Sequence, residues 1–453
     1  MLRALLRPLL VTTLALGCGN GDDDSGQTSK ATSGGASANG GKGATTSSGG
    51  GPSASGTGGT LPATGGRGGA AGSAAGGSGN KATTGGGAGS SGSGTSGTSG
   101  TGQAGAGGGG TSGNGGTSGN SGTGGGAGGA ALSGVRIVGR TETGTDGLRF
   151  SWPGVSFAAR FSGTQASIQL SDAANKNEFE VVVDGTPEKT PIVTTSGQTT
   201  YPIATNLDDG EHQVVVWRRT EAYDGSTEFL GFTGFSSGGG LLAPPDPAPH
   251  RIEVIGDSIT VGYGNEGTLP CTADTTNENN YLAYASVAAR EVKADIVTIA
   301  WSGIGMYRNY GDAGPSTDTM PTRYDRAVPT ETDSTWDFSR FTPDAVVINL
   351  GTNDYSTHGD PGQPFVDAYV NFVEHVRTKY PSAYIFCLIQ ASGSDVNINA
   401  VVDMMKSSGD KAIESFDINV TDGGNGCDYH PDVAKDQAMG DKLAGELKNV
   451  LGW

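Results

Sequence analysis

Residues 252–264 read IEVIGDSITVGYG, and the second half of the chain is best interpreted outward from them. A short apolar run, 252–255, ends abruptly in Gly256, Asp257 and Ser258. An apolar run of strand length that breaks into Gly-Asp-Ser predicts a buried strand that delivers a serine to the edge of a sheet. Such a serine is either a helix N-cap or a nucleophile, and the rest of the chain decides between the two.

Residues 250–453 alternate between runs of strand length and segments with helical spacing. In one such segment Leu282, Ala285 and Val292 recur on one face of a helix. The alternation predicts a parallel sheet with helices on both faces, in which ligands bind at the carboxyl ends of the strands. The expected strands are 252–255, 296–300, 345–350, 384–389 and 415–418, and the expected helices are 280–293, 365–379, 398–407 and 431–450.

Short polar motifs follow three of these strands and precede the last helix. Each suits a step of acyl transfer, because a serine hydroxyl needs a base and the tetrahedral oxyanion needs fixed N–H donors. The motifs are Gly256-Asp257-Ser258, Ser302-Gly303-Ile304-Gly305, Gly351-Thr352-Asn353-Asp354 and Asp428-Tyr429-His430-Pro431.

The motifs predict a role for each polar residue. Ser258 is the candidate nucleophile and His430 the candidate base. The expected oxyanion donors are the backbone N–H groups of Ser258 and Gly303 and the uncharged side-chain amide of Asn353. Pro431 suits the first turn of the last helix, which would hold His430 just outside the helix N-terminus.

Residues 135–245 show short strand-like runs separated by turns and no convincing helical spacing. Asp184-Gly185 after an apolar run is a strong hairpin signal. Many short strands predict a β-sandwich, whose role is either packing against its neighbour or carbohydrate binding. The proline-rich segment 241–249 then connects it to the second unit. The expected strands are 135–138, 148–152, 156–161, 166–170, 178–183, 213–217 and 229–235.

The Ser, Gly, Asn and His motifs, in that order, resemble the SGNH or GDSL hydrolase superfamily over residues 250–453. The β-rich unit and further motifs narrow the resemblance to carbohydrate esterase family 2. This resemblance implies a jelly-roll domain over 135–245 and a flavodoxin-like SGNH hydrolase domain. It also implies a serine esterase, without metal or cofactor, that removes O-acetyl groups from plant polysaccharides such as xylan or mannan through an acetyl-enzyme. The further motifs lie at 139–140, 150–154, 262–267, 276–279, 336–338 and 427–431.

The chain departs from the superfamily pattern beside the histidine. The acidic member of the triad usually stands three residues before the histidine, and here that position is Cys427. A thiol cannot orient an imidazole as a carboxylate does. Members of family 2 use a Ser–His dyad steadied by a backbone carbonyl. The resemblance therefore implies a dyad of Ser258 and His430 assisted by the backbone of Asp428, with the Asp428 carboxylate as the alternative third member.

Competing interpretations remain for several residues. Ser258 could act only as a helix N-cap, and His358 is a rival base with no motif around it. Trp301 and Trp336 suit a platform for a sugar ring, although aromatic side chains equally pack in cores. Two other functions also stay open: a GDSL lipase or thioesterase, and a carbohydrate-binding protein without catalytic activity.

The N-terminal third of the chain predicts export. Arg3 and Arg7 precede an apolar run, 9–16, and Gly17-Cys18 follow, which fits a signal peptide over 1–18 with a lipobox-like cysteine. Residues 19–134 hold most of the 81 glycines, together with Ser, Thr, Ala and Asn. Such a segment buries too little apolar surface to fold, so we expect a disordered tether.

The net charge restricts the possible partners, and the cysteines permit a disulfide. The formal net charge of −18 argues against nucleic acid, which needs a basic surface. The expected partner, from the family resemblance, is an acetylated polysaccharide or oligosaccharide. We expect a monomer that contacts a membrane only through a lipid on Cys18. Export permits a disulfide among Cys271, Cys387 and Cys427, but the pairing stays open.

Overall fold

The computed structural model describes residues 132–453. The expected signal peptide, Cys18 and all but the last few residues of the expected tether lie outside the described residues. None of the described helices is both long and apolar enough to span a bilayer.

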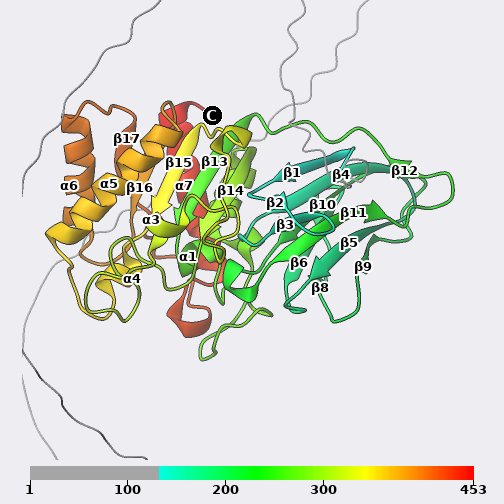
Figure 1. The fold of residues 1–453 in the computed structure, drawn as a ribbon, viewed down its shortest axis with the longest axis horizontal. Helices are drawn as coiled ribbons and strands as arrows, with labels where there is room; N and C mark the ends of the chain where they lie inside the picture. Colours follow the sequence, from blue (N-terminus) through cyan, green and yellow to red (C-terminus); the bar gives the residue numbers. More distant parts are fainter. Residues whose placement is uncertain (1–131) are drawn as a thin grey trace, which may run out of the picture. The chain divides into compact units, whose positions relative to one another are not determined.

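The first described unit consists of two antiparallel sheets packed against each other (Figure 1). Phe157 of one sheet stacks on Phe229 of the other, with ring centroids 4.0 Å apart. The first sheet contains β1 (Val135–Val138), β4 (Ser156–Gly163), β6 (Glu178–Val183), β7 (Thr186–Pro187), β8 (Ile192–Val193), β10 (Gly210–Arg218) and β12 (Gly240–Leu241). The second contains β2 (Glu142–Thr143), β3 (Leu148–Phe150), β5 (Ala166–Asp172), β9 (Thr200–Ala204) and β11 (Thr227–Thr233).

The sandwich expected from the sequence is confirmed, and each expected run contains a strand. The hairpin predicted at Asp184-Gly185 is confirmed, because β6 and β7 pair on either side of this turn. The sequence did not indicate β2, β8, β9 or β12. Three of these span only two residues, too few to show an alternating pattern. The fourth, β9, contains Pro202, and it lies at the end of its sheet, where a missing backbone N–H is tolerated.

The second unit is built on a parallel sheet, as predicted, and its strand order is β14-β13-β15-β16-β17. Because both faces are covered by helices, the strands other than the edge strand β17 are mainly apolar and buried. The strands are β13 (His250–Gly256), β14 (Ala294–Ala300), β15 (Ala345–Asn349), β16 (Tyr384–Ile389) and β17 (Ile413–Asp417).

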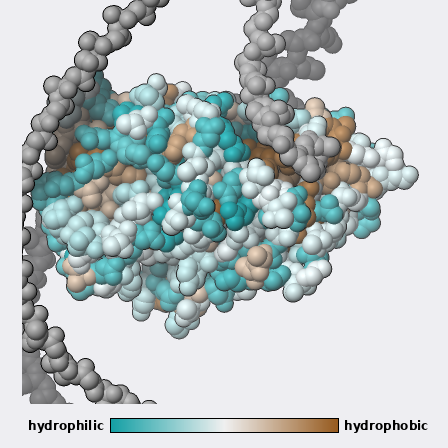
Figure 2. All heavy atoms as spheres, in the orientation of Figure 1, coloured by the Kyte–Doolittle hydropathy of each residue, from teal (hydrophilic) through white to brown (hydrophobic). Residues whose placement is uncertain are grey.

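Helices cover the two faces of this sheet (Figure 1). Ile252 and Val254 of β13 pack with α2 and α7, whereas Ile255 faces the side of α5 and α6. Figure 2 shows a mainly hydrophilic or neutral surface, with hydrophobic residues in small groups. The helices are α1 (Ser258–Val261), α2 (Tyr284–Glu291), α3 (Met320–Arg323), α4 (Thr352–Tyr355), α5 (Gln363–Lys379), α6 (Asp395–Ser407) and α7 (Val433–Leu451), and the short 3-10 turns are η1 (Ala222–Asp224), η2 (Asn280–Leu282), η3 (Phe338–Arg340) and η4 (Cys427–Tyr429).

All four expected helix starts differ from the structure. Helices α5 and α6 begin at Gln363 and Asp395, two and three residues before the expected 365 and 398. The expected helix 280–293 begins as η2 and becomes α-helical only at Tyr284. The last helix begins at Val433, so Pro431 precedes it and does not occupy its first turn. Asp432 caps this helix instead, because its carboxylate accepts the backbone N–H of Lys435 at 2.8 Å.

The sandwich packs directly against the parallel-sheet unit. Arg140 of the sandwich donates to Glu253 of β13 at 3.2 Å, and both side chains are fully buried. Trp217 of β10 donates its indole N–H to Asn280 at 3.2 Å. A single core of buried apolar side chains also runs from one unit into the other. Packing against the neighbour, one of the two roles expected for the sandwich, is therefore observed.

Candidate active site

Ser258 lies at the turn between the central strand β13 and α1. Gly256 ends β13, and Asp257 caps α1 by accepting the N–H of Ile259 at 3.1 Å. A side chain at position 256 would collide with Thr260, so this sharp turn requires glycine. The turn places the Ser258 hydroxyl at the carboxyl end of the sheet, where parallel sheets bind their ligands.

His430 approaches Ser258 from the other end of the sequence. Its Nε2 lies 2.7 Å from Ser258 Oγ, and its Nδ1 lies 3.2 Å from the backbone oxygen of Asp428. A carbonyl oxygen can only accept a hydrogen bond, so Nδ1 carries the proton and Nε2 is free to accept the Ser258 hydroxyl proton. This is the arrangement that a general base for a serine nucleophile requires.

The backbone around Asp428 is unusual. Asp428 and Tyr429 both have positive φ values, 48° and 66°, which non-glycine residues rarely adopt. The Asp428 carboxylate points away from the imidazole and accepts from the backbone N–H of Ala273 at 3.0 Å and from the Tyr263 hydroxyl at 3.4 Å. The carbonyl of Asp428, and not its carboxylate, therefore contacts His430.

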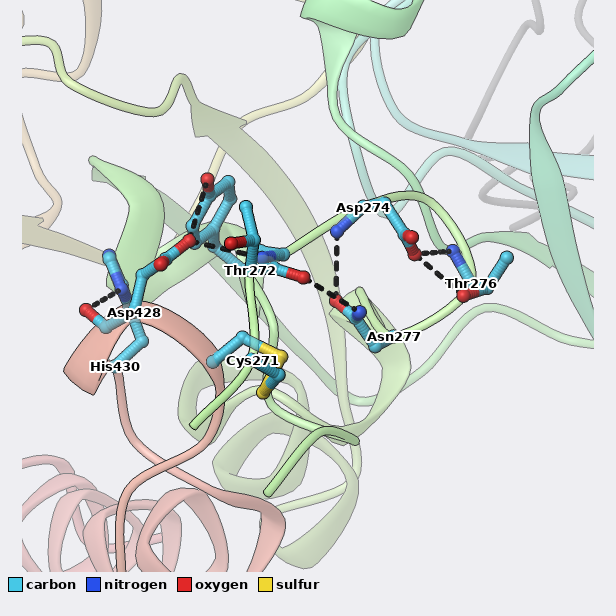
Figure 3. The surroundings of a disulfide bond; sticks show 10 residues. Cys271, Thr272, Asp274, Thr276, Asn277, Asp428 and His430 are labelled. Carbon is cyan, nitrogen blue, oxygen red and sulfur yellow. Dashed lines mark hydrogen bonds between the residues drawn. A yellow bond between two sulfur atoms is a disulfide. The ribbon is translucent and has the colours of Figure 1, made fainter. Parts of the chain in front are cut away.

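A disulfide fixes this turn to the loop beside it. Cys271 and Cys427 are bonded, and Figure 3 shows Asp428 and His430 immediately next to the bridge. The backbone N–H of Asp428 also donates to the oxygen of Cys271 at 3.1 Å. The third cysteine of residues 132–453, Cys387, is a buried free thiol in β16. The pairing that the sequence left open is thus between Cys271 and Cys427.

The surroundings of His430 favour its neutral form. Burial lowers the pKa of His430 below its ordinary value of 6.5, and the Asp428 carbonyl offsets only part of this effect. The Tyr263 ring lies against the imidazole, with centroids 4.7 Å apart. A neutral imidazole near pH 7 is the state in which a base can take a proton.

The two other expected oxyanion donors lie in neighbouring loops. Asn353, in α4, donates from Nδ2 to the oxygen of Ile304 at 2.7 Å, which joins its loop to the one that carries Gly303. The same nitrogen lies 3.3 Å from the carboxylate of Asp257, the residue before Ser258. Gly303 has a φ of 79°, and no described backbone oxygen accepts its N–H. Asn353 therefore links the residue after Gly303 to the residue before Ser258, and an oxyanion would accept from its amide in place of the longer contact with Asp257.

Asp354 holds the loop that follows Gly303, a role that the sequence did not reveal. Its buried carboxylate accepts the backbone N–H groups of Met306, Tyr307 and Arg308 at 2.9, 2.7 and 2.9 Å. Burial raises the pKa of Asp354, and these three hydrogen bonds oppose the shift. The only sequence signal was an acidic residue directly after Asn353 at a strand end.

The two expected aromatic residues lie in different environments. Trp301 directly follows β14, and its ring lies against the guanidinium of Arg323, 3.8 Å from the centroid. Trp336 is only 7% exposed and packs against Arg140 and Arg340. Trp336 is therefore packed in the interior, which is the alternative that the sequence left open beside a sugar platform.

The rival base is not at this site. His358 is exposed, and its Nε2 lies 3.3 Å from the oxygen of Gly311. Its position agrees with the absence of a motif around it in the sequence.

Exposed tyrosines surround the site and were not singled out from the sequence. Tyr429 adjoins His430 and is 76% exposed. Tyr310 donates its backbone N–H to Gly303 and is 63% exposed. Tyr223 of the sandwich is 72% exposed and meets Trp301 edge to face, with centroids 6.0 Å apart.

Two family models match the chain. The model described as Carbohydrate esterase 2 N-terminal matches residues 137–245. The model described as GDSL-like Lipase/Acylhydrolase family matches residues 254–432. Both matches fall within the described residues, and together they include Ser258, Gly303, Asn353 and His430.

Curated relatives are esterases. The chain is 41% identical over 319 residues to Cellulase/esterase CelE of Acetivibrio thermocellus, a match that covers 68% of this chain and 38% of CelE. The chain therefore spans well under half of the length of that relative. It is 31% identical over 327 residues to an Acetylxylan esterase / glucomannan deacetylase of Cellvibrio japonicus, which covers 67% of this chain and 86% of that protein.

Solved structures that resemble this chain include carbohydrate esterases of family 2. A family two carbohydrate esterase from Clostridium thermocellum in complex with cellohexaose has a TM-score of 0.66 and 39% identity, covering 71% of this chain and 100% of that chain. A carbohydrate esterase family 2 enzyme plus carbohydrate binding domain from Corynascus thermopiles (Myceliophthora fergusii) has a TM-score of 0.62 and 33% identity, covering 70% and 100%.

Proposed function

This chain belongs to carbohydrate esterase family 2, and on that premise we propose that it is a serine esterase that removes O-acetyl groups from plant cell-wall polysaccharides. The observation that carries the proposal is the contact of 2.7 Å between Ser258 Oγ and His430 Nε2 at the carboxyl end of the parallel sheet. A histidine base at hydrogen-bonding distance from a serine hydroxyl is the arrangement that acyl transfer needs.

In the first step, Ser258 Oγ attacks the acetyl carbonyl carbon while His430 Nε2 takes the hydroxyl proton. The carbonyl π electrons move to oxygen, and the N–H groups of Ser258, Gly303 and Asn353 stabilise this oxyanion. When the tetrahedral intermediate collapses, the C–O bond to the sugar breaks and His430 returns the proton to the sugar oxygen. The products are a free sugar hydroxyl and an acetylated Ser258.

In the second step, water replaces the sugar. His430 takes a proton from water as the water oxygen attacks the acetyl carbon, and the same donors stabilise the second oxyanion. Collapse breaks the bond to Ser258 Oγ, which recovers its proton from His430, and acetate leaves. Throughout the cycle the Asp428 carbonyl accepts a hydrogen bond from His430 Nδ1–H. This contact keeps Nε2 as the nitrogen that exchanges protons with the reactants.

The exposed tyrosines near the site support a sugar substrate. Tyr223, Tyr310, Tyr429 and Trp301 offer flat apolar faces beside a polar catalytic centre, which suits pyranose rings with alternating apolar faces and hydroxyl edges. The names of the relatives point to acetylated xylan and glucomannan as the first polymers to test.

Acetate release tests the proposal. Wild-type protein and Ser258→Ala should be compared on acetylated xylan, acetylated glucomannan and acetylated pectin, and on p-nitrophenyl esters of increasing acyl length. We expect acetate from xylan or glucomannan, a preference for acetyl over long acyl groups, and a loss of at least about 10³-fold in Ser258→Ala. A preference for long acyl chains would favour a lipase instead. Equal, negligible rates in both proteins would favour a binding protein.

We also propose that the protein is exported and is anchored to the cell envelope through a lipid on Cys18. The Cys271–Cys427 disulfide supports export, because structural disulfides persist in oxidising compartments. Cys18→Ala should move the protein from the membrane fraction to the soluble fraction. An unchanged distribution of the variant would exclude the lipid anchor.

A further inference from the structure

The side chain of Glu221 reaches from the sandwich to the loop that carries Gly303. Glu221 directly precedes η1 and is 4% exposed, and its Oε2 accepts the backbone N–H of Ser302 at 2.8 Å. We propose that Glu221 is a positioning residue for the oxyanion hole, because it fixes the Trp301–Ser302 peptide, which is next to the peptide that carries the Gly303 N–H. The proposal rests on the esterase function above and gives the sandwich a part in catalysis.

The Gly303 N–H needs support on both sides. A glycine with a φ of 79° is not restrained by a side chain, so its neighbours must fix the direction of its N–H. On the C-terminal side, Asn353 binds the oxygen of Ile304 at 2.7 Å. On the N-terminal side, the contact with Glu221 is the only one described for the Ser302 N–H.

A chain of hydrogen bonds connects Glu221 to the nucleophile. Glu278 accepts the backbone N–H of Glu221 at 2.5 Å. Two residues later, Asn280 donates from Nδ2 to the oxygens of Thr260 and Val261, at 3.0 and 3.1 Å, in the helix that Ser258 begins. Through Glu221 the oxyanion loop is therefore tied to the same segment that holds the nucleophile helix.

Stability alone does not explain a carboxylate at this position. Within residues 132–453 no cationic nitrogen lies within salt-bridge distance of the Glu221 carboxylate. The nearby Arg218 donates its N–H groups to neutral acceptors, including the backbone oxygen of Glu221. Burial raises the pKa of Glu221 to about 7, which shows that the site disfavours its charge. Burying a carboxyl group without a cation costs free energy, so packing alone does not favour glutamate here, and the contact that its carboxyl group makes is with the Ser302 N–H.

The test compares kcat and KM for p-nitrophenyl acetate in the full chain and its variants. Glu221→Ala removes the oxygen that accepts the Ser302 N–H. Glu221→Asp moves the carboxylate away from this N–H by one methylene, and Glu221→Gln keeps an oxygen in the same place. Glu180→Ala is the matched control, since Glu180 is also buried in the sandwich but contacts Arg219 and Asn279. Thermal unfolding identifies the variants that fold. If Glu221→Ala does not fold, the comparison rests on Glu221→Asp.

We expect Glu221→Ala and Glu221→Asp to lose about 10- to 100-fold in kcat with little change in KM, because a displaced oxyanion donor weakens transition-state binding. Glu221→Gln should stay within about threefold of wild type, as should Glu180→Ala. Wild-type kcat in a folded Ala or Asp variant, or a loss in Glu221→Gln as large as in Glu221→Ala, would overturn the proposal. Wild-type rates no higher than those of Ser258→Ala would instead refute the esterase function itself.

Discussion

The two oxygen-bearing groups of Asp428 have different partners. Its carbonyl faces His430 Nδ1 at 3.2 Å, whereas its carboxylate binds the N–H of Ala273 at 3.0 Å. Asp428→Asn keeps both the backbone oxygen and an acceptor for Ala273. We therefore predict that kcat for acetyl esters stays within about tenfold of wild type, whereas removal of a true triad carboxylate costs about 10⁴-fold.

Steady-state kinetics of Asp428→Asn check this prediction, with Asp432→Asn as the control for loss of a nearby carboxylate. A loss approaching that of Ser258→Ala would show that the Asp428 carboxylate is a working third member. The dyad described here would then be wrong.

The burial of His430 sets the acid limit of activity. Because burial lowers its pKa below the ordinary 6.5, the free imidazole stays neutral to lower pH than an exposed histidine would. The base works only when it is neutral, so activity is present above the His430 pKa and lost as the pH falls through it. We predict that kcat/KM falls on the acid side with a midpoint below 6.5, measured in buffers of constant ionic strength. An acid midpoint above 6.5 would contradict this assignment.

Sequence motifs indicated the residues that the structure places at and beside the Ser258–His430 contact, but not those that support them. Ser258, Gly303, Asn353 and His430 follow strand ends or precede a helix, so their positions could be read from the chain. For Trp336 the sequence left a sugar platform and core packing equally open, because an aromatic residue in a loop has the same sequence signal whether it packs or is exposed. Asp354 and Glu221 could not be assigned a role, since each acts on backbone groups that only the folded chain brings near.

Among the elements, the turn 427–430 depends on its disulfide. The Cys271–Cys427 bridge closes a sequence separation of 156 residues and adjoins the turn that carries His430. We predict that the double variant Cys271→Ala, Cys427→Ala loses about 2–5 kcal/mol of unfolding free energy and part of its kcat. Denaturant unfolding and acetyl-ester kinetics measure the two effects.

Reductant supplies the control for the disulfide. Dithiothreitol should lower the stability of the wild type and leave the double variant unchanged, because the remaining Cys387 is a buried free thiol. Equal stability of the wild type and the double variant would show that the bridge does not hold this turn.

Long, buried elements were predicted more accurately than short or exposed ones. Strands such as β15 and β16 were visible as continuous apolar runs, since helices cover both faces of the sheet, whereas the edge strand β17, with the sequence IESFD, was predicted two residues late. The start of α7 was misplaced because Pro431 and Asp432 both suit a helix N-terminus, and only the hydrogen bond to Lys435 shows that Asp432 is the cap. Two-residue strands such as β2 and β12 exist only through their partners.

At the level of the whole molecule, the sandwich and the parallel-sheet unit share one core. Trp152 of the sandwich is fully buried and donates to the oxygen of Arg326, and Arg140 pairs with Glu253. We predict that residues 132–453 retain wild-type kcat on soluble acetyl esters. Residues 250–453 alone should lose cooperative unfolding and activity, because separation exposes apolar surface and buried charges.

Circular dichroism melts and acetyl-ester kinetics of the two fragments check this prediction. A stable, active fragment of residues 250–453 would contradict it, and would also show that the sandwich is dispensable for the reaction.

The central claim is that the acetyl group passes through Ser258. Enzyme quenched with acid during turnover of p-nitrophenyl acetate should be digested and analysed by mass spectrometry. We predict one acetyl group on Ser258 in the peptide that contains residues 252–264, and none in the matching peptide of Ser258→Ala. An acetyl-enzyme at another residue, or full hydrolysis by Ser258→Ala, would contradict the account.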